Sequence, residues 1–181
     1  QVMANNGQSN AGVEVFGIAP DDLKTIPRIA HSDQAIGDID RFDQGIALGI
    51  GVARTLGVGI GDRIKLISPN GVKTAFGTSP RVNAYEVVYI FAAGRYDIDR
   101  SRAYLPISDS QIFFNREGLA DELEVMVEDP EAVNQMANAL LRAAGDNTQI
   151  WTWRDASGAF LSALDIEDRV MFVILSVLVL I

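Results

Sequence analysis

The alternation of apolar and polar residues predicts strands in the first half of the chain. Residues 1–4 and 12–18 are short apolar runs separated by the turn-forming sequence N-N-G-Q-S-N, so we expect them to form a hairpin. Residues 62–67 and 82–91 are further strand candidates, rich in β-branched and aromatic residues, and the charged residues 94–102 are expected to form a turn. Because side chains alternate across a strand, the fourth run should place four large residues on one face: Tyr85, Val87, Tyr89 and Phe91.

Two short helices are predicted around these strands. One covers residues 51–56 and ends at Gly57, since glycine readily adopts the left-handed conformation found just after a helix. The other covers residues 109–116, with Ile112 and Phe113 directed inward.

After a boundary near residues 117–120, the pattern predicts a β-α-β unit. Residues 122–128 and 150–153 alternate as strands do. Between them, Asp129 can cap a helix and Pro130 suits its first turn. The predicted helix has an apolar stripe whose members are three or four residues apart: Val133, Met136, Ala137, Leu140, Leu141 and Ala144.

Residues 170–181 form an apolar run in which Ser176 is the only polar residue. A helix capped by Asp155 is expected to start at residue 156 and to continue without a break into this run. Apolar runs of about 10–14 residues are often buried core helices, but every face of this run is apolar, which favours the start of a transmembrane helix. The charges before the run sum to −2, which is typical of a non-cytoplasmic flank: Asp165, Glu167, Asp168 and Arg169.

Composition excludes several classes of function. The net charge is −9 and the Lys and Arg residues are scattered, which argues against a nucleic-acid-binding surface. The chain has no cysteine and a single histidine, His31, so it cannot form a usual zinc site. Gly49 and Gly51 begin like a dinucleotide-binding fingerprint, but Arg54 stands in place of the third glycine. We therefore expect no metal, no cofactor and no catalytic site, which disfavours a secreted enzyme with a C-terminal anchor.

The loop predicted at residues 68–81 is the main candidate site. It has fourteen residues, whereas a hairpin needs only about two to five. Pro69 and Pro80 near its ends resist continuing a ladder, and apolar Val72 and Phe76 lie between them. Such a loop is a candidate for docking a partner, while an ordinary loop with Phe76 folded back onto its own domain is the alternative. The candidate contact residues are Pro69, Asn70, Gly71, Val72, Lys73, Thr74, Ala75, Phe76, Gly77, Thr78, Pro80 and Arg81.

Several linked segments resemble one family of bacterial permeases. In chain order they are G-V-E-V-F-G-I-A-P at 12–20, L-G-V-G-I-G-D-R-I-K-L-I-S-P-N-G at 56–71, G-T-S-P-R at 77–81, I-F-A-A-G-R-Y-D-I-D at 90–99 and W-x-x-x-x-x-x-F-L-x-A-L-x-I-E-D-R-V-M-F at 153–172. Together these segments resemble the LolC/LolE family, the permease subunits of the lipoprotein-releasing ABC transporter. The resemblance covers nearly the whole chain, and the combination of segments makes it specific.

The resemblance implies an α+β fold like the MacB-type periplasmic core. That core has a mixed α/β porter part and an inserted β-rich sabre part that bears a long hairpin hook. The hook pattern S-P-x-G-x-x-T-P-x-G-x-x-P-R maps onto residues 68–81, with Ala75 in place of a usual proline. The implied parts are porter 1–33, sabre 34–118 with the hook at 68–81, porter 119–158 and the start of a transmembrane helix at 159–181.

The resemblance also implies a role and partners. The chain would be the portion of an inner-membrane permease that lies in the periplasm between its first two transmembrane helices, without its first segment and ending inside the second helix. It would pass lipoproteins from the inner membrane to the periplasmic chaperone LolA. Val72 and Phe76 would enter an apolar groove of LolA, and Lys73 and Arg81 would face acidic groups at the groove's rim.

The remaining partners and the alternative follow from the same resemblance. A second permease subunit, identical or different, and a separate cytoplasmic subunit that hydrolyses ATP would complete the transporter, so this chain would not be catalytic. The alternative is the stalk domain of a MacB-type efflux or signalling permease that contacts an adaptor protein. The long loop at residues 68–81 favours the lipoprotein-releasing interpretation, because a stalk needs no protruding hook.

Overall fold

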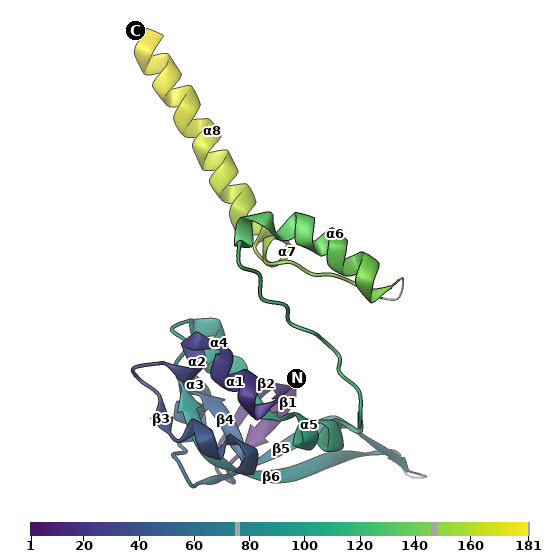
Figure 1. The fold of residues 1–181 in the computed structure, drawn as a ribbon. Coiled ribbons are helices and arrows are strands. Elements are labelled where there is room, and N and C mark those ends of the chain that lie inside the picture. The colour runs from purple at the N-terminus through teal and green to yellow at the C-terminus, as the bar shows by residue number, and fades with distance from the viewer. Residues whose placement is uncertain (75–76, 146–147, 181) are drawn as a thin grey trace. The chain divides into compact units, whose positions relative to one another are not determined.

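The computed structural model describes residues 1–74, 77–145 and 148–180. The chain divides into two compact units, Gln1–Asp121 and Glu122–Ile181, which we call unit 1 and unit 2. Figure 1 shows strands and helices in unit 1, and helices joined by irregular chain in unit 2. The presence of both element types agrees with the predicted α+β class.

Unit 1 is built on a sheet whose pairings close on themselves. Neighbouring strands follow the order β1, β2, β7, β4, β6, β5, and β5 pairs again with β1, while β3 adds a short edge to β6. Such closure gives most backbone groups of these strands a ladder partner. The strands are β1 (Val2–Asn5), β2 (Asn10–Ile18), β3 (Ile36–Gly37), β4 (Ile46–Gly49), β5 (Arg63–Thr74), β6 (Gly77–Phe91) and β7 (Arg102–Pro106).

The first hydrophobic core of unit 1 lies within this ring. It takes buried side chains from all six strands of the ring and from two helices, α3 (Ile50–Leu56) and α5 (Ile107–Phe114). Alternation along β4 shows how the sheet divides the apolar residues, because Ile46 and Leu48 belong to this core whereas Ala47 faces a second one.

The second core covers the other face of β4, β6 and β7. It is closed by α1 (Pro20–Thr25), α2 (Pro27–Ala30) and the short 3-10 helix η1 (Ile39–Gln44). The helix α4 (Tyr96–Ser101) adds Ile98 at its edge. Both faces of these central strands are therefore buried, as expected for strands with near-continuous apolar sequence.

A register shift in β6 changes which residues share a face. Val88 is an extra residue in the pairing of β6 with β4. The partners on either side of the shift are Val87 with Ile46 and Tyr89 with Ala47. Val87 consequently packs in the first core, whereas Tyr89 and Phe91 pack in the second. The prediction of one shared face for the four large residues of this strand is therefore wrong, because a bulge resets the alternation.

Local signals predicted several elements of unit 1 correctly. The β1–β2 hairpin is present, and α3 ends at Gly57, which has a φ of 67° and the left-handed conformation. The second predicted helix is present as α5, with Phe113 buried but Ile112 exposed. The turn predicted at residues 94–102 is wrong, since this segment contains α4. This short helix packs closely against the start of α3, at Gly49 and Gly51.

The helix predicted in unit 2 is confirmed. It is α6 (Val133–Ala144), preceded by the 3-10 turn η2 (Pro130–Ala132). The carboxylate of Asp129 accepts a hydrogen bond from the backbone N–H of Glu131 at 3.0 Å, so the predicted cap is in place. The helix ends at Gly145.

The two strands predicted beside this helix are wrong. Among the described residues of unit 2 there is no strand, and both residues 122–128 and residues 150–152 lack regular structure. Leu123, in the first of these segments, is 88% exposed. A strand persists only where a neighbour completes its ladder, and the described part of unit 2 offers no sheet for these segments to join.

The last helices of unit 2 also differ from the prediction. The helix expected to start at residue 156 begins earlier, as α7 (Trp153–Ala156), and α8 (Gly158–Leu180) follows after an interruption at Ser157. Its N-cap is Thr152, not Asp155. Within the described residues, no helix combines the length and the apolar content needed to cross a membrane. The start of a transmembrane helix at this place stays a prediction.

Candidate functional site

The candidate site predicted as a loop is mostly a continuation of the β5–β6 hairpin. The ladder runs from Arg63 opposite Glu86 to Ser68 opposite Arg81, and it resumes beyond that pair as far as Thr74 opposite Gly77. The prediction of a fourteen-residue loop is therefore wrong, because most of residues 68–81 pair as strands. We call residues 69–74 of β5 and 77–80 of β6 the arm.

An irregularity in the ladder explains how the arm accommodates its prolines. Between two paired positions, β5 has three residues where β6 has one. The three residues are Pro69, Asn70 and Gly71, and the one opposite them is Pro80. Proline has no backbone N–H and is tolerated in strands mainly at such bulges. The two prolines therefore interrupt the ladder without ending it, and a bulge of this kind bends the strand and increases its twist.

Gly71 is required by close contact between the two strands of the arm. A Cβ atom at this position would lie 1.5 Å from the backbone oxygen of Ser79 and 2.9 Å from the Cα of Pro80. No side chain fits in that space. The sequence P-x-G on β5 and the proline on β6 together form the irregularity at the start of the arm.

The base of the arm is tied to the core of unit 1. Ser68 is buried, and the guanidinium of Arg81 donates a hydrogen bond to the backbone carbonyl of Phe113 at 3.1 Å. This carbonyl is close to the end of α5, where helix carbonyls lack intrahelical partners and favour cations. The ring of Phe113 is buried and meets the ring of Tyr85 edge to face, with centroids 6.3 Å apart. The hairpin is thus fixed in direction where it leaves the sheet.

The electrostatics at this base are set mainly by burial. Burial raises the pKa of the Tyr85 hydroxyl above its ordinary value, while a hydrogen bond from Asn83, at 3.4 Å, acts in the opposite direction. Arg81 contributes a positive charge at this base, and its side chain is half-buried.

The arm extends beyond the other strands of unit 1. Figure 1 shows the far ends of β5 and β6 running out past the rest of the sheet. Among the described residues, strand pairing beyond Ser68 and Arg81 is between β5 and β6 only. Ala75 and Phe76 lie outside the described residues, so the predicted apolar tip is not tested. The contacts predicted for Val72 and Lys73 also stay predictions.

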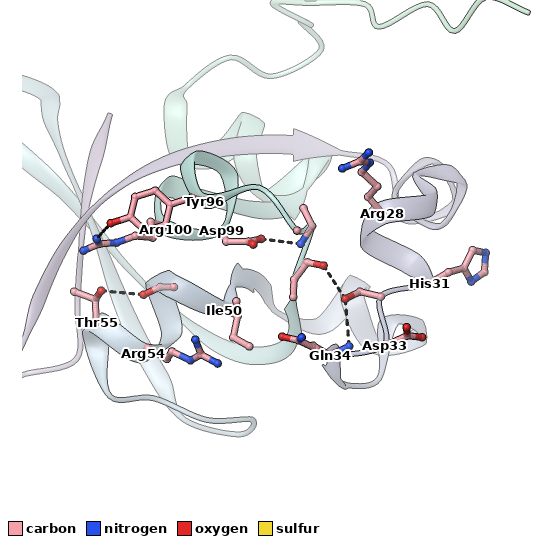
Figure 2. A pocket seen from close by; sticks show the side chains of 15 residues that line it. Arg28, His31, Asp33, Gln34, Ile50, Arg54, Thr55, Tyr96, Asp99 and Arg100 are labelled. Carbon is pink, nitrogen blue, oxygen red and sulfur yellow. Dashed lines mark hydrogen bonds between the residues drawn. The ribbon is translucent and has the colours of Figure 1, made fainter.

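The structure brings together other groups that sequence reasoning missed. A cavity of about 740 Å³ in unit 1 is lined by α3, α4, the end of α2 and the segment after β6. Figure 2 shows its polar side chains, which include Arg28, Arg54 and Arg100. These arginines are far apart in the sequence, so no spacing could have indicated that they share a cavity. Within the described residues, no cluster of His, Cys, Asp or Glu is placed to hold a metal ion.

Comparison with known proteins gives relatives over nearly the whole chain. The lipoprotein-releasing system transmembrane protein LolC of Neisseria meningitidis serogroup B is 27% identical over 186 aligned residues, which cover 98% of this chain and 43% of that protein. The LolC protein of Xylella fastidiosa (strain Temecula1) is 25% identical, with 96% of this chain and 42% of that protein covered. These matches support membership of the LolC/LolE family.

The extent of these matches sets what they support. The chain spans about two fifths of the length of the LolC proteins it matches. No model of a known protein family matches the chain. The resemblance inferred from residues 12–20, 56–71, 77–81, 90–99 and 153–172 is confirmed at the level of the family.

Proposed function

We propose that this chain is part of the permease of a lipoprotein-releasing ABC transporter and that the arm docks a soluble lipoprotein carrier. The family supports the first statement, because the relatives are named as transmembrane proteins of a lipoprotein-releasing system. The carrier would be a chaperone of the LolA type, which accepts the acyl chains of a lipoprotein. In this proposal the chain binds the carrier and helps to transfer the lipoprotein to it, and a separate subunit hydrolyses ATP.

The observation that carries this proposal is the construction of the arm. Pro69, Pro80 and the close contact at Gly71 lie at the irregularity in its ladder, and Arg81 ties its base to the end of α5. A docking element that is already ordered loses little conformational entropy on binding, so more of the contact free energy remains as affinity. A strand pair that extends past its own sheet, without other pairing partners among the described residues, fits such a role.

The chemistry of the arm matches an acyl-chain carrier. Val72 and Phe76 are the apolar side chains proposed to enter the carrier's groove, and Lys73 and Arg81 are proposed to face acidic groups at its rim. Buried apolar anchors supply most of the affinity in such interfaces, whereas charges at the rim act mainly on orientation and association rate.

The arrangement in the membrane is part of the same proposal. Residues 1–33 and 119–158 would form the porter part and residues 34–118 the sabre part, both on the periplasmic side of the inner membrane. Strands β1 and β2 of the first porter segment pair with β5 and β7 of the sabre segment. The apolar residues of α8 are largely exposed around the helix, from Val170 to Val179. This exposure supports the proposal that α8 continues into the membrane in the full-length permease, which would pair with a second permease subunit.

The proposal is tested by measuring how the full chain binds the LolA-type carrier of the same organism. Phe76→Ala should weaken binding by at least about tenfold, as loss of a central interface contact does. Arg81→Glu reverses a charge at the rim, so it should weaken binding less and mainly by slowing association. Gly71→Ala should also weaken binding, because the added Cβ forces the two strands of the arm apart. Biolayer interferometry with immobilised carrier gives the dissociation constants.

Matched controls separate the arm from general damage to unit 1. Gly12→Ala adds a methyl group to a strand at a position with open space, and Met3→Ala removes an exposed apolar side chain from the neighbouring strand. Arg63→Glu reverses an exposed charge on the same hairpin. These three variants should bind the carrier normally. Unchanged affinity in both Phe76→Ala and Arg81→Glu would exclude the arm as the docking element.

A further inference from the structure

The cavity near α3 and α4 is built by close backbone packing. A Cβ atom on Gly49 would lie 2.5 Å from the backbone oxygen of Asp99, and one on Gly51 would lie 2.6 Å from the Cγ of Arg100. Both glycines therefore allow α4 to rest directly on the start of α3. This contact brings Arg54, near the end of α3, and Arg100, on α4, to the same cavity. The glycines that begin like a dinucleotide fingerprint thus have a packing role.

The opposite wall is fixed by a separate contact. The hydroxyl of Ser32 donates to the backbone carbonyl of Ala92 at 2.7 Å, which ties the segment after α2 to the end of β6. This contact holds Arg28 and His31 at the rim. Figure 2 shows Arg28 and Arg54 on different sides of the cavity, with Ile50 between them in this view.

The cavity lining has one more arginine than aspartate, although the protein carries a net charge of −9. Three arginines and two aspartates line it. One carboxylate, that of Asp99, already accepts a hydrogen bond from the backbone N–H of Ala93 at 2.7 Å. Arg100 donates to the hydroxyl of Tyr96 and lies over its ring. In the part of the chain that the structure describes, neither Arg28 nor Arg54 forms an ion pair.

We propose that this cavity binds a small ligand that carries a phosphate group. A doubly charged phosphate matches two guanidinium groups, Arg28 and Arg54, whose planar forks donate several hydrogen bonds to its oxygens. Both side chains are exposed and long, so they can turn toward one anion. The cavity is much larger than phosphate alone, which leaves room for an organic group against Ile50 and the ring of Tyr96.

Two sources could supply this chemistry, and the experiment separates them. One is the headgroup of an anionic phospholipid, and the other is a soluble phosphate ester. For the soluble source, isothermal titration calorimetry on the full 181-residue chain in neutral detergent would use inorganic phosphate, glycerol 3-phosphate and glycerol. The first two should bind and glycerol should not. Arg28→Ala and Arg54→Ala should each weaken binding by about tenfold, as loss of a charge-assisted hydrogen bond predicts.

Two further variants test whether the arginine fork matters. Arg54→Lys keeps the charge but loses the planar fork, so it should bind more weakly than the wild type and more tightly than Arg54→Ala. Arg63→Ala removes an exposed arginine of unit 1 that does not line the cavity, and it should leave binding unchanged.

For the lipid source, flotation with phosphatidylcholine vesicles would be compared with and without phosphatidylglycerol. Because α8 can bind both vesicles through its apolar residues, the informative quantity is the additional binding to phosphatidylglycerol in the wild type minus that in the Arg28→Ala/Arg54→Ala variant. An arginine-dependent gain identifies a headgroup, and glycerol 3-phosphate binding without such a gain identifies a soluble ester. If neither probe depends on Arg28 and Arg54, the phosphate site is excluded. The site is separate from the arm, so carrier binding should be unaffected by these variants.

Discussion

Units 1 and 2 contain the same kinds of sequence pattern but differ in what they bury. Among the described residues, the hydrophobic core lies entirely in unit 1, between Val2 and Phe113. No described residue of unit 2 is buried, although it has an alternating segment at 122–128 and an amphipathic helix, α6. An apolar pattern therefore shows only that a segment can be buried. Whether it is buried depends on other elements that pack against it.

The contacts within unit 2 are local or polar. The indole N–H of Trp153 donates to the backbone carbonyl of Pro130 at 2.8 Å, and Arg154 forms an ion pair with Glu131. The apolar side of α6 is only half-covered, since Leu141 is 43% exposed. Exposed ion pairs and single hydrogen bonds contribute little each. Unit 2 should therefore unfold more easily than unit 1.

The largest loss of stability is expected from a mutation in the buried core, which unit 1 has and the described part of unit 2 lacks. Phe42, in η1, is fully buried in the second core, so Phe42→Ala should lower the free energy of unfolding of unit 1 by about 3–5 kcal/mol. The counterpart in unit 2, Leu141→Ala, should change the free energy of unfolding of unit 2 by no more than about 0.5 kcal/mol, because the Leu141 side chain is largely outside any core. Urea titration gives both values.

The aromatic residues provide a separate signal for each unit. All four tyrosines belong to unit 1, whereas both tryptophans, Trp151 and Trp153, belong to unit 2. Near-ultraviolet circular dichroism of tyrosine should therefore respond to Phe42→Ala, while tryptophan fluorescence should not. A comparable loss of stability from Leu141→Ala would show that α6 is part of a core after all.

A smaller effect tests the polar contact inside the core of unit 1. The hydroxyl of Tyr89 is buried and donates a hydrogen bond to the backbone carbonyl of Ile29 at 2.8 Å. Tyr89→Phe leaves this carbonyl without its donor and should cost about 1–2 kcal/mol. The control, Tyr96→Phe, changes a side chain that is 74% exposed and should cost less.

The same tyrosine predicts how the stability of unit 1 depends on pH. Burial raises the pKa of Tyr89, so above pH of about 10 the unfolded chain loses this proton more readily than the folded chain. The contribution is thus fully present below that pH and is lost as the pH rises through the folded pKa. Urea titrations at increasing pH should show a shallower decline in Tyr89→Phe than in the wild type. Parallel declines would contradict the role assigned to this hydroxyl.

The sequence predicted the elements that depend on local chemistry. Gly57 ends α3 through its own left-handed conformation, and Asp129 caps the turn before α6 by accepting a hydrogen bond from a backbone N–H two residues later. The register shift at Val88 was missed, since it depends on how β6 pairs with β4. The strand at residues 122–128 was predicted but is absent from the structure, because a ladder needs a second segment.

The candidate site was predicted in place but not in form. Pro69, Gly71 and Pro80 drew attention to residues 68–81, but they indicated a loop where the structure has a strand pair with an irregular register. Both prolines fit into the strand pair because the ladder is irregular at that point, and this irregularity depends on how the two strands pair. The cavity was missed because Arg28 and Arg54 come from different helices, and only the tertiary fold brings them together.

The smallest expected effect lies in unit 2, at the start of α7, where stability depends on one reciprocal cap. The hydroxyl of Thr152 donates to the carboxylate of Asp155 at 2.7 Å and accepts from the backbone N–H of Asp155 at 3.3 Å. The backbone N–H of Thr152 also donates to this carboxylate, at 2.9 Å. The Thr152 hydroxyl, followed by its backbone N–H, holds the pKa of Asp155 below the ordinary value.

Thr152→Ala should therefore raise the pKa of Asp155 towards its ordinary value and reduce helical order at Trp153–Ala156, with no change in the tyrosine signals of unit 1. Because the folded pKa is depressed, the contribution of the cap is present above pH of about 4 and is lost as the pH falls through the folded value. An NMR titration of the Asp155 carboxyl carbon measures this directly, and Thr152→Ser, which keeps the hydroxyl, should retain the depressed pKa. If Thr152→Ala leaves the pKa unchanged, then packing and not the cap orders α7, and unit 2 has a more cooperative structure than its exposed side chains indicate.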